Sequence, residues 1–529
     1  MEFHSTSFLL FAFVTLLLYF TVPKRFQWWI LLAANYVFYA FAGLKYLAFL
    51  LFTTLVAYVI ARWMQQRIDA EDAYVLAHRD TMEKAERKAF RSSEKKKRLH
   101  LLLTGLFLTL GLLAVVKYTG FVLSGVRTIW VSMGNRPFSV PTLLLPLGIS
   151  FYTFQTVGYL IDVYRKKIKA ERNLAKFALF VSFFPQLIQG PLSRFGDLGE
   201  QLTSPHAFSG SAFGAGLLRV VWGYFKKIVV ADTAMIAVRT LVEQSTAYNG
   251  VYVFLLILLY SVQIYGDFTG GIDITIGLSE MMGIRLAENF NRPFASRSTK
   301  EYWRRWHITM GAWFTDYVFY PLSVSNSMQR LSKWSRAHLG EQIGKRLPVY
   351  FATVVTWFLT GLWHGAGMNF IVWGLLNCLV ILVSQELQPL YTRFHKRFPG
   401  LAERKGWQIF QCVRTFLLMG WIRSLDCYRD VSKTFYLWGT VFTKWNLPAL
   451  LAGGWLDLGL SVVDWFVLGG GILLIFAVSQ LGKREPLRYR LVKRPAVLCL
   501  CICILTVLIL LFGSYGIGYD ASDFIYGQF

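Results

Sequence analysis

Charged residues are scarce in this chain. Asp, Glu, Lys and Arg make up 16% of its 529 residues, whereas hydrophobic residues make up 55%. A soluble protein carries about 25% charged residues, so this composition excludes an ordinary soluble domain. Several uninterrupted apolar runs are long enough to cross a bilayer, which takes about 20 residues each. We therefore expect an all-α, polytopic protein of the cell membrane.

Acidic residues and cysteines are also few. Asp and Glu number 30 against 55 Lys and Arg, which gives a formal net charge of +25. The basic residues fall in loops between apolar runs, which is the positive-inside pattern, so contact with membrane lipids is expected and nucleic-acid binding is not. The six cysteines lie in or beside apolar runs without metal-ligand spacing, so we expect neither a disulfide framework nor a metal site.

The first apolar run lacks both a basic segment before it and a small-residue cleavage site after it, so we expect it to be retained as a span. A segment at 177–194, interrupted by Pro185, Gly190 and Pro191, is expected to be re-entrant because its freed backbone groups need protein or water partners. The pattern indicates about eleven or twelve spans of about 20 residues. They lie at residues 7–22, 26–41, 44–61, 101–123, 143–164, 213–236, 252–265, 348–362, 370–383, 407–421, 462–481 and 496–512.

Basic clusters set the expected orientation. The segments 24–25, 62–98, 165–167, 393–405 and 483–494 fall on one side, which the positive-inside rule makes cytoplasmic and which leaves both termini outside. The segment 62–98 is dense in both charge signs and predicts one or two solvated helices. It is either a passive cytoplasmic insertion or a docking site for a carrier protein, within a single domain spanning 1–529.

One ionisable side chain, His364, lies in the apolar stretch 356–376, with Gly361, Gly365 and Gly367 around it. Glycines so placed let a helix break and let another backbone or a ligand come close. An imidazole at membrane depth must face protein, water or substrate. From this stretch alone, His364 is either a hydrogen-bonded packing residue or a functional one.

A polar segment at 289–307 precedes a predicted helix. Ser298 and Glu301 have the spacing of a capping box, so the helix is expected to begin there, to continue through Tyr320 and to stop at Pro321. On such a helix His307 and Trp303 would share a face.

Asp267 and Asp273 lie inside a membrane-like stretch. The favoured interpretation is structural pairing with a buried cation such as an Arg, and the alternative is an ion or proton site.

Six segments in order resemble the membrane-bound O-acyltransferase family, and the likeness covers nearly the whole chain except 62–98. They are residues 145–155, 189–195, 267–277, 294–307, 361–366 and 524–529. Within that family the likeness is greatest to bacterial members of the alginate O-acetylation type, followed by the teichoic-acid D-alanyl transferase type. The resemblance implies a ring of spans around a central ridge of re-entrant helices that forms a funnel or tunnel. It matches His364 to the family histidine and His307 to a second histidine of the site.

Acyl transfer from a thioester to an alcohol needs a base for the hydroxyl proton and a donor for the developing oxyanion. We expect His364 to be the general base, with His307 or the Trp363 N–H orienting the groups or stabilising the oxyanion. An acyl-enzyme is the alternative, but no Ser or Cys stands beside either histidine. The further substrate-binding candidates are Trp303, Arg304, Arg305 and Asn369.

The expected donor is a thioester, acetyl-CoA or an acyl carrier protein, and no cofactor is expected to stay bound. Arg297 and Lys300 are candidates for attracting its phosphates, or are ordinary positive-inside charges. The family pattern implies an exported or membrane-anchored acyltransferase partner that completes transfer to a polysaccharide. The alternatives are D-alanyl transfer to teichoic acid, a transporter that uses Asp267 and Asp273, and a structural scaffold of an export complex.

Overall fold

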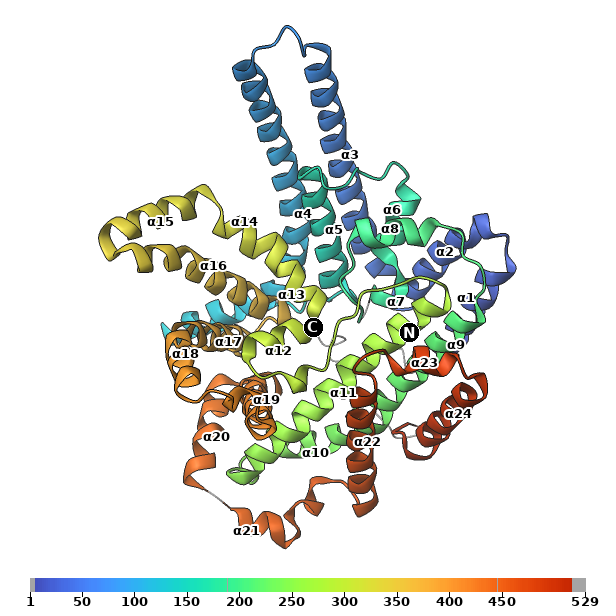
Figure 1. Cartoon of the computed structure of the whole chain (residues 1–529), viewed down its shortest axis with the longest axis vertical. Helices are drawn as coiled ribbons and strands as arrows, with labels where there is room; N and C mark the ends of the chain where they lie inside the picture. The colour runs from blue at the N-terminus through green and yellow to red at the C-terminus, as the bar shows by residue number, and fades with distance from the viewer. Residues whose placement is uncertain (1–4, 188, 445, 516–529) are drawn as a thin grey trace. The chain divides into compact units, whose positions relative to one another are not determined.

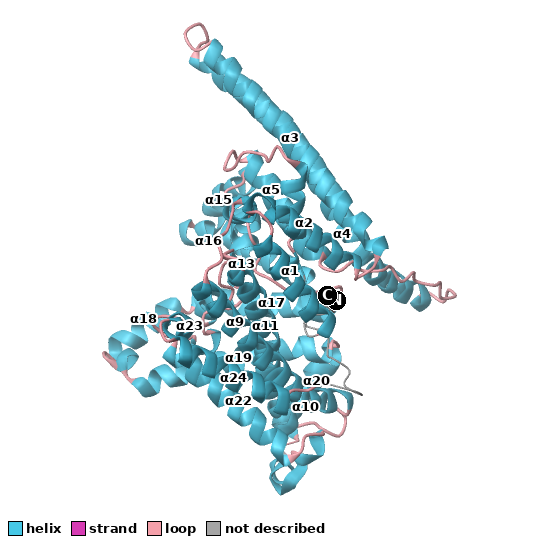
Figure 2. Ribbon diagram, turned by 90° about the vertical axis from the view of Figure 1, so that its right-hand side faces the viewer, coloured by secondary structure: helices cyan, strands magenta, loops and turns pink. Residues whose placement is uncertain are grey.

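The computed structural model describes residues 5–187, 189–444 and 446–515. Within these ranges the chain is helical, with no strand and one isolated antiparallel bridge between Phe290 and Trp306 (Figure 2). The all-α prediction is therefore confirmed. The chain divides into two compact units, residues 1–209 with 282–286 and residues 210–281 with 287–529, and the expected single domain stays a prediction. The chain-end motif at 524–529 and the chain terminus lie outside the described residues.

The first unit contains eight α-helices within the described ranges. They are α1 (Thr6–Thr21), α2 (Gln27–Ala40), α3 (Leu47–Ala77), α4 (Lys84–Ser132), α5 (Ile149–Tyr164), α6 (Leu174–Ser182), α7 (Phe184–Leu187) and α8 (Phe195–Thr203). Of these, α3 and α4 lie side by side as an antiparallel hairpin (Figure 1). The charged segment 62–98 does not form separate helices. It extends both apolar helices without a break, because residues 62–77 and 84–98 contain neither Gly nor Pro.

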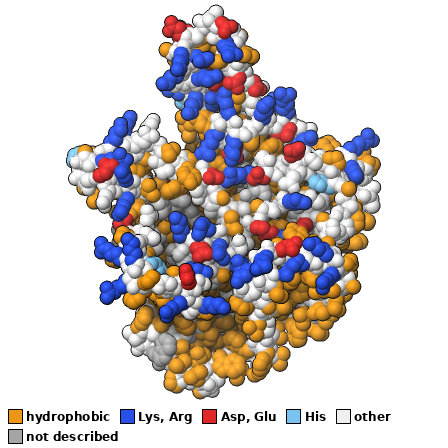
Figure 3. Space-filling model, viewed as in Figure 1, with side chains coloured by type: hydrophobic (Ala, Val, Ile, Leu, Met, Phe, Trp, Pro, Cys, Tyr) orange, Lys and Arg blue, Asp and Glu red, His pale blue; other side chains and the backbone are white. Residues whose placement is uncertain are grey.

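Ion pairs join the two arms of the hairpin. Glu71 of α3 pairs with Arg98 of α4, and both side chains are buried. Glu94 of α4 pairs with Lys97 at 2.6 Å and with Arg67 of α3 at 3.4 Å. Lys and Arg side chains are dense on the outer surface of the hairpin (Figure 3). Partly buried charge pairs thus add to the apolar contacts between the arms, such as that of Tyr74 with Phe90 at a centroid distance of 4.6 Å.

Short, interrupted helices replace a simple span at residues 174–187. Buried Asn35 of α2 satisfies the backbone groups at the break. Its Oδ1 accepts a hydrogen bond from the Phe184 N–H at 2.9 Å, and its Nδ2 donates to Ser182 Oγ at 3.2 Å and to the Leu179 carbonyl at 3.4 Å. This is the protein partner that the broken sequence required.

The second unit contains the remaining α-helices, and its central one is α11. Of the most apolar 18-residue stretch of α11, 72% is buried inside the protein. Pairs of glycines let α9 pack closely against it. A Cβ at Gly216 would come 2.5 Å from the carbonyl oxygen of Gly277, and one at Gly223 would come 2.6 Å from that of Gly270. The helices are α9 (Gly210–Tyr224), α10 (Asp232–Glu243), α11 (Val251–Met281), α12 (Thr299–Arg305), α13 (Ile308–Phe314), α14 (Tyr320–Ser323), α15 (Asn326–Leu339), α16 (Glu341–His364), α17 (Met368–Glu386), α18 (Gln388–Arg397), α19 (Lys405–Tyr428), α20 (Val431–Thr443), α21 (Leu447–Ala449), α22 (Val462–Leu481), α23 (Leu487–Val492) and α24 (Pro495–Phe512).

Asp267 and Asp273 of α11 are both ion-paired, as the favoured interpretation predicted. Asp267 pairs with Lys227 at 2.7 Å, and Asp273 pairs with Arg219 at 2.8 Å and with Lys226 at 2.6 Å. The two lysines lie in a π-helical segment, Phe225–Ala231, that continues α9. The expected buried cations are therefore present, and of the three partners one is an arginine and two are lysines.

Six helices in the described ranges are long and apolar enough to cross a membrane. The larger number expected from the sequence, and the funnel, stay predictions. Several other predicted spans coincide with helices that are shorter or that carry more charges. The six helical stretches are Leu44–Ala77, Lys84–Ser132, Val251–Met281, Met368–Glu386, Val462–Leu481 and Pro495–Phe512.

The long helix predicted from Ser298 to Pro321 was wrong, although its start was right. Ser298 Oγ accepts a hydrogen bond from the Glu301 N–H at 3.2 Å, which caps α12 as expected. The helix then ends at Arg305, and His307 adopts a left-handed conformation with φ of 49°. A second helix, α13, begins at the next residue.

The break has a non-local cause. The Asn291 N–H donates to the carbonyl of Arg305 at 2.9 Å, and the Ile308 N–H donates to the carbonyl of Asn289 at 3.0 Å. These bonds to a distant segment replace intrahelical bonds at the end of α12. Consequently His307 and Trp303 do not share a helix face.

Candidate active site

His307 occupies the break between α12 and α13 and is fully enclosed, with 0% of its surface exposed. Its ring packs against Phe268 of α11 at a centroid distance of 4.9 Å. The left-handed backbone at His307 turns the side chain inward, toward the segment that contains Asn289. The position of the imidazole therefore depends on a strained turn and on a partner 18 residues earlier in the chain.

Asn289 fixes the tautomer of His307. Its Oδ1 accepts hydrogen bonds from the backbone N–H of Thr309 at 3.1 Å and from Thr309 Oγ1 at 3.0 Å. Because the same oxygen lies 3.2 Å from His307 Nδ1, we assign the hydrogen to Nδ1, which leaves Nε2 as the lone-pair nitrogen.

His307 is a weak base in this setting. It lies outside the candidate spans, and burial together with the positive charge of Arg423 lowers its pKa to about 3. The imidazole is therefore neutral near pH 7 and can accept a hydrogen bond at Nε2. It has little affinity for a proton.

His364 is the last residue of α16 and retains slight exposure, at 8%. Its ring contacts Trp363 at 5.0 Å and Trp373 of α17 at 4.6 Å between centroids. The Trp363 ring also contacts His307, at 5.8 Å. The two predicted histidines are thus brought to the same tryptophan.

A close crossing of α16 and α17 positions His364. A Cβ at Gly361 would come 2.4 Å from the carbonyl oxygen of Phe370, and one at Gly374 would come 2.5 Å from that of Trp357. Only glycine allows this approach.

Arg423 of α19 is a buried cation beside the aromatic cluster. Its guanidinium lies 4.6 Å from the ring centroid of Trp306 and 5.8 Å from that of Trp373. The Oδ2 of Asp426, one helical turn further along α19, lies 3.9 Å from the Nη1 of Arg423. The cation is thus held over tryptophan faces, where the ring quadrupole attracts it.

The other predicted site residues are divided between the cluster and the surface. Trp303 packs on Trp373 at 5.7 Å, and Asn369 donates to the carbonyl of Leu425 at 3.4 Å, which ties α17 to α19. Arg305 is committed to Glu301 at 2.6 Å. The structure leaves three basic candidates exposed and does not bring them to the histidines, namely Arg297, Lys300 and Arg304.

The sequence-based interpretation missed Asn289 and Arg423. A signal existed for Arg423, which interrupts an apolar run at 416–425 in the way that marks an intramembrane functional residue. Nothing in the local sequence singled out Asn289, because its partner Thr309 is 20 residues away.

Comparison with known proteins gives one consistent result. The model of the membrane-bound O-acyltransferase family matches residues 167–420, which include both histidines. A probable alginate O-acetylase from Pseudomonas syringae is 35% identical over 455 residues, covering 85% of this chain and 77% of the relative. A peptidoglycan O-acetyltransferase from Helicobacter pylori is 29% identical over 422 residues, covering 74% and 70%. A teichoic acid D-alanyltransferase from Bacillus subtilis is 26% identical over 297 residues, covering 54% and 70%.

Proposed function

Because the chain belongs to the membrane-bound O-acyltransferase family, we propose that it takes an acetyl group from a cytoplasmic thioester and passes it on for O-acylation of an exported polysaccharide. Two similar proteins are named as O-acetyltransferases of alginate and of peptidoglycan, which supports a polysaccharide acceptor. The observation that carries the proposal is the pair of histidines that contact one buried tryptophan.

His364 is the general base of the proposed reaction. It removes the proton from the acceptor hydroxyl while the oxygen attacks the thioester carbonyl. The C–S bond then breaks, and the thiolate that leaves takes the proton from the imidazolium. His364 suits this role better than His307, because it keeps some exposure whereas His307 is fully enclosed.

His307 orients the acceptor in this proposal. With its hydrogen on Nδ1, held by Asn289, His307 offers Nε2 as a fixed acceptor for a substrate hydroxyl. It therefore cannot donate to an oxyanion while neutral. That donor is instead the indole N–H of Trp363, which lies between the histidines.

The donor is a thioester of coenzyme A or of an acyl carrier protein. The exposed cations Arg297, Lys300 and Arg304 suit attraction of its phosphates, and the charged α3–α4 hairpin suits docking of a carrier protein. A separate exported or membrane-anchored acyltransferase completes the transfer to the polysaccharide. A transporter is the weaker candidate, because Asp267 and Asp273 are both engaged by buried cations.

The test is the O-acyl content of cell-surface polysaccharide, released by mild base. The cells carry wild-type protein, His364→Ala or the control His338→Ala, in which an exposed histidine of α15 is removed, at matched membrane levels. Loss of ester with His364→Ala alone supports the proposal. Acetate or D-alanine among the released acids separates the two transfer reactions. Unchanged ester in His364→Ala would remove this residue from the mechanism.

A further inference from the structure

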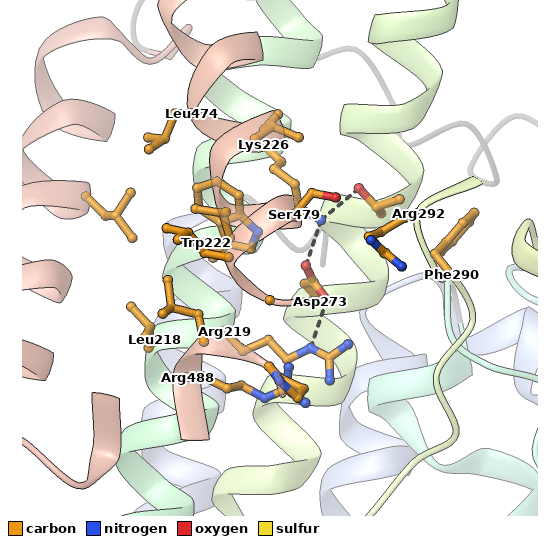
Figure 4. A pocket seen from close by; sticks show the side chains of 18 of the residues that line it. Leu218, Arg219, Trp222, Lys226, Asp273, Phe290, Arg292, Leu474, Ser479 and Arg488 are labelled. Carbon is orange, nitrogen blue, oxygen red and sulfur yellow. Dashed lines mark hydrogen bonds and ion pairs between the residues drawn. The ribbon is translucent and has the colours of Figure 1, made fainter. Parts of the chain in front are cut away.

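A cavity lies in the same unit as the histidines, and neither histidine lines it. Its volume is about 530 Å³, within the usual range of about 300–1,000 Å³ for ligand sites. Its walls come from α9, α11, α22, α23 and α24 and from the segment 288–292 (Figure 4). Phe290 separates the two sites, since it lines the cavity and packs against Trp306 at 5.0 Å.

One end of the cavity is charged. Figure 4 shows Arg219, Lys226 and Asp273 pointing toward one another. Asp273 accepts from Arg219 at 2.8 Å and from Lys226 at 2.6 Å. Glu288 accepts from both terminal nitrogens of Arg219, at 2.7 and 2.6 Å, and from Arg488 at 3.2 Å. Both carboxylates of the lining are thus fully engaged by buried or half-buried cations.

The lining carries more positive than negative charge. It contains five cationic side chains against these two carboxylates. Lys483 is exposed and Arg292 is half-buried, and within the part of the chain that the structure describes neither side chain has an ion-pair partner. Arg292 also has a left-handed backbone, with φ of 47°. The cavity lining therefore has two cations available for an anion.

The other end of the cavity is apolar and belongs to two candidate membrane spans. Only 11% of the most apolar 18-residue stretch of α22 is buried inside the protein, and the same holds for α24. Large hydrophobic side chains cover the outer surfaces of both helices (Figure 3). The apolar lining from these two helices includes Leu474, Ile475, Val478, Ile504, Leu505 and Leu508.

We propose that this cavity binds an anionic membrane phospholipid, with its phosphate on Lys483 and Arg292 and one acyl chain between α22 and α24. A soluble anion would leave the apolar end unfilled, and a zwitterionic phospholipid would bring its own ammonium group next to the two cations. Basic pockets between transmembrane helices hold phospholipid headgroups by this combination of charge and apolar wall. The inference does not depend on the roles assigned to the histidines.

Lipid binding has a structural consequence for the neighbouring site. Four of the five residues 288–292 line the cavity. The fifth is Asn289, which is hydrogen-bonded to His307. A lipid that orders this segment also orders the acceptor of the His307 hydrogen bond.

The experiment measures lipid binding by native mass spectrometry. Full-length protein is purified in detergent, stripped of lipid and titrated with phosphatidylglycerol or phosphatidylcholine of identical chains. The test variant is Arg292→Gln with Lys483→Gln. The matched control is Lys493→Gln with Arg494→Gln, two exposed cations outside the lining. A third variant, Leu505→Trp, fills the apolar end without changing charge.

We expect wild type and control to bind one phosphatidylglycerol at least tenfold more tightly than phosphatidylcholine. The test variant should lose this preference, and Leu505→Trp should weaken both lipids. Inorganic phosphate should not displace the lipid. Equal affinity of wild type for the two lipids, or the same preference in test and control variants, would overturn the proposal. Displacement of the lipid by coenzyme A would also overturn it, by assigning the cavity to the donor.

Discussion

Lowering the pH from 7 to 5 tests the enclosure of His307. The pKa of His307 is about 3 in the folded protein, because of burial and the charge of Arg423, against 6.5 for a free imidazole. Between these values the unfolded chain binds a proton that the folded chain does not, so folding stability falls as the pH drops below 6.5. Linkage gives a loss of about 2 kcal/mol between pH 7 and pH 5 from this one residue.

The assay is equilibrium unfolding in detergent at both pH values, followed by tryptophan fluorescence. The comparison protein is His307→Gln, whose amide N–H can still donate to Asn289 but does not titrate. All other ionisable groups are shared, so the difference between the two pH losses isolates His307. We expect wild type to lose about 2 kcal/mol more than the variant. An equal loss in both proteins would mean that His307 is hydrated and protonated like a surface histidine, and the assignment of its role would fall.

Three further changes test the packing and charge arguments. Gly361→Val should destabilise the protein by about 1–3 kcal/mol and abolish ester formation, because a Cβ at this position would lie 2.4 Å from the carbonyl oxygen of Phe370 and displace it. The control Gly469→Val should retain activity, because a Cβ there has no other atom within 4 Å. Lys227→Met should cost at least about 3–5 kcal/mol in thermal or denaturant unfolding, because it leaves two buried carboxylates that the lysine contacts at 2.7 and 2.9 Å; wild-type stability would contradict the ion pairing. Asn289→Ala should cost about 1–3 kcal/mol for each hydrogen-bond donor that it leaves without an acceptor, and it should lower kcat more than it raises KM. Asn289→Asp keeps an acceptor oxygen for the Thr309 donors and should recover that part of the stability. Similar unfolding of the two variants would contradict the hydrogen-bond network.

Local chemistry made part of this fold predictable. The cap at Ser298 was predictable because a hydroxyl and the N–H three residues later form a local bond. The burial of Asp273 predicted a cation, since an uncompensated carboxylate among apolar residues is too costly. Its partners, Arg219 and Lys226, lie 54 and 47 residues away, so their identity depended on the packing of α9 against α11.

The break at His307 was not predictable for the same reason. The sequence from Thr299 onward suits a continuous helix, and the chain leaves it only because residues 305–308 bond to residues 289–291. Local propensity is overridden where a distant backbone offers bonds of equal quality. The candidate site therefore lies where the sequence-based prediction of the helix failed, and the two histidines named from the sequence both contact Trp363 there.

The unbroken course of α4 gives the first unit a stiff stalk. Its 49 residues make a rod of about 74 Å, and α3 braces the charged part along its side. The number of residues in the helices determines how far the tip of the hairpin extends and which way it faces, because each added residue turns the tip by about 100° and moves it about 1.5 Å along the helix axis. Removing seven residues from each arm would shorten the stalk by about 10 Å with nearly the same face presented, whereas removing five would turn that face away. The length of the hairpin thus determines both the distance and the direction at which its tip is presented.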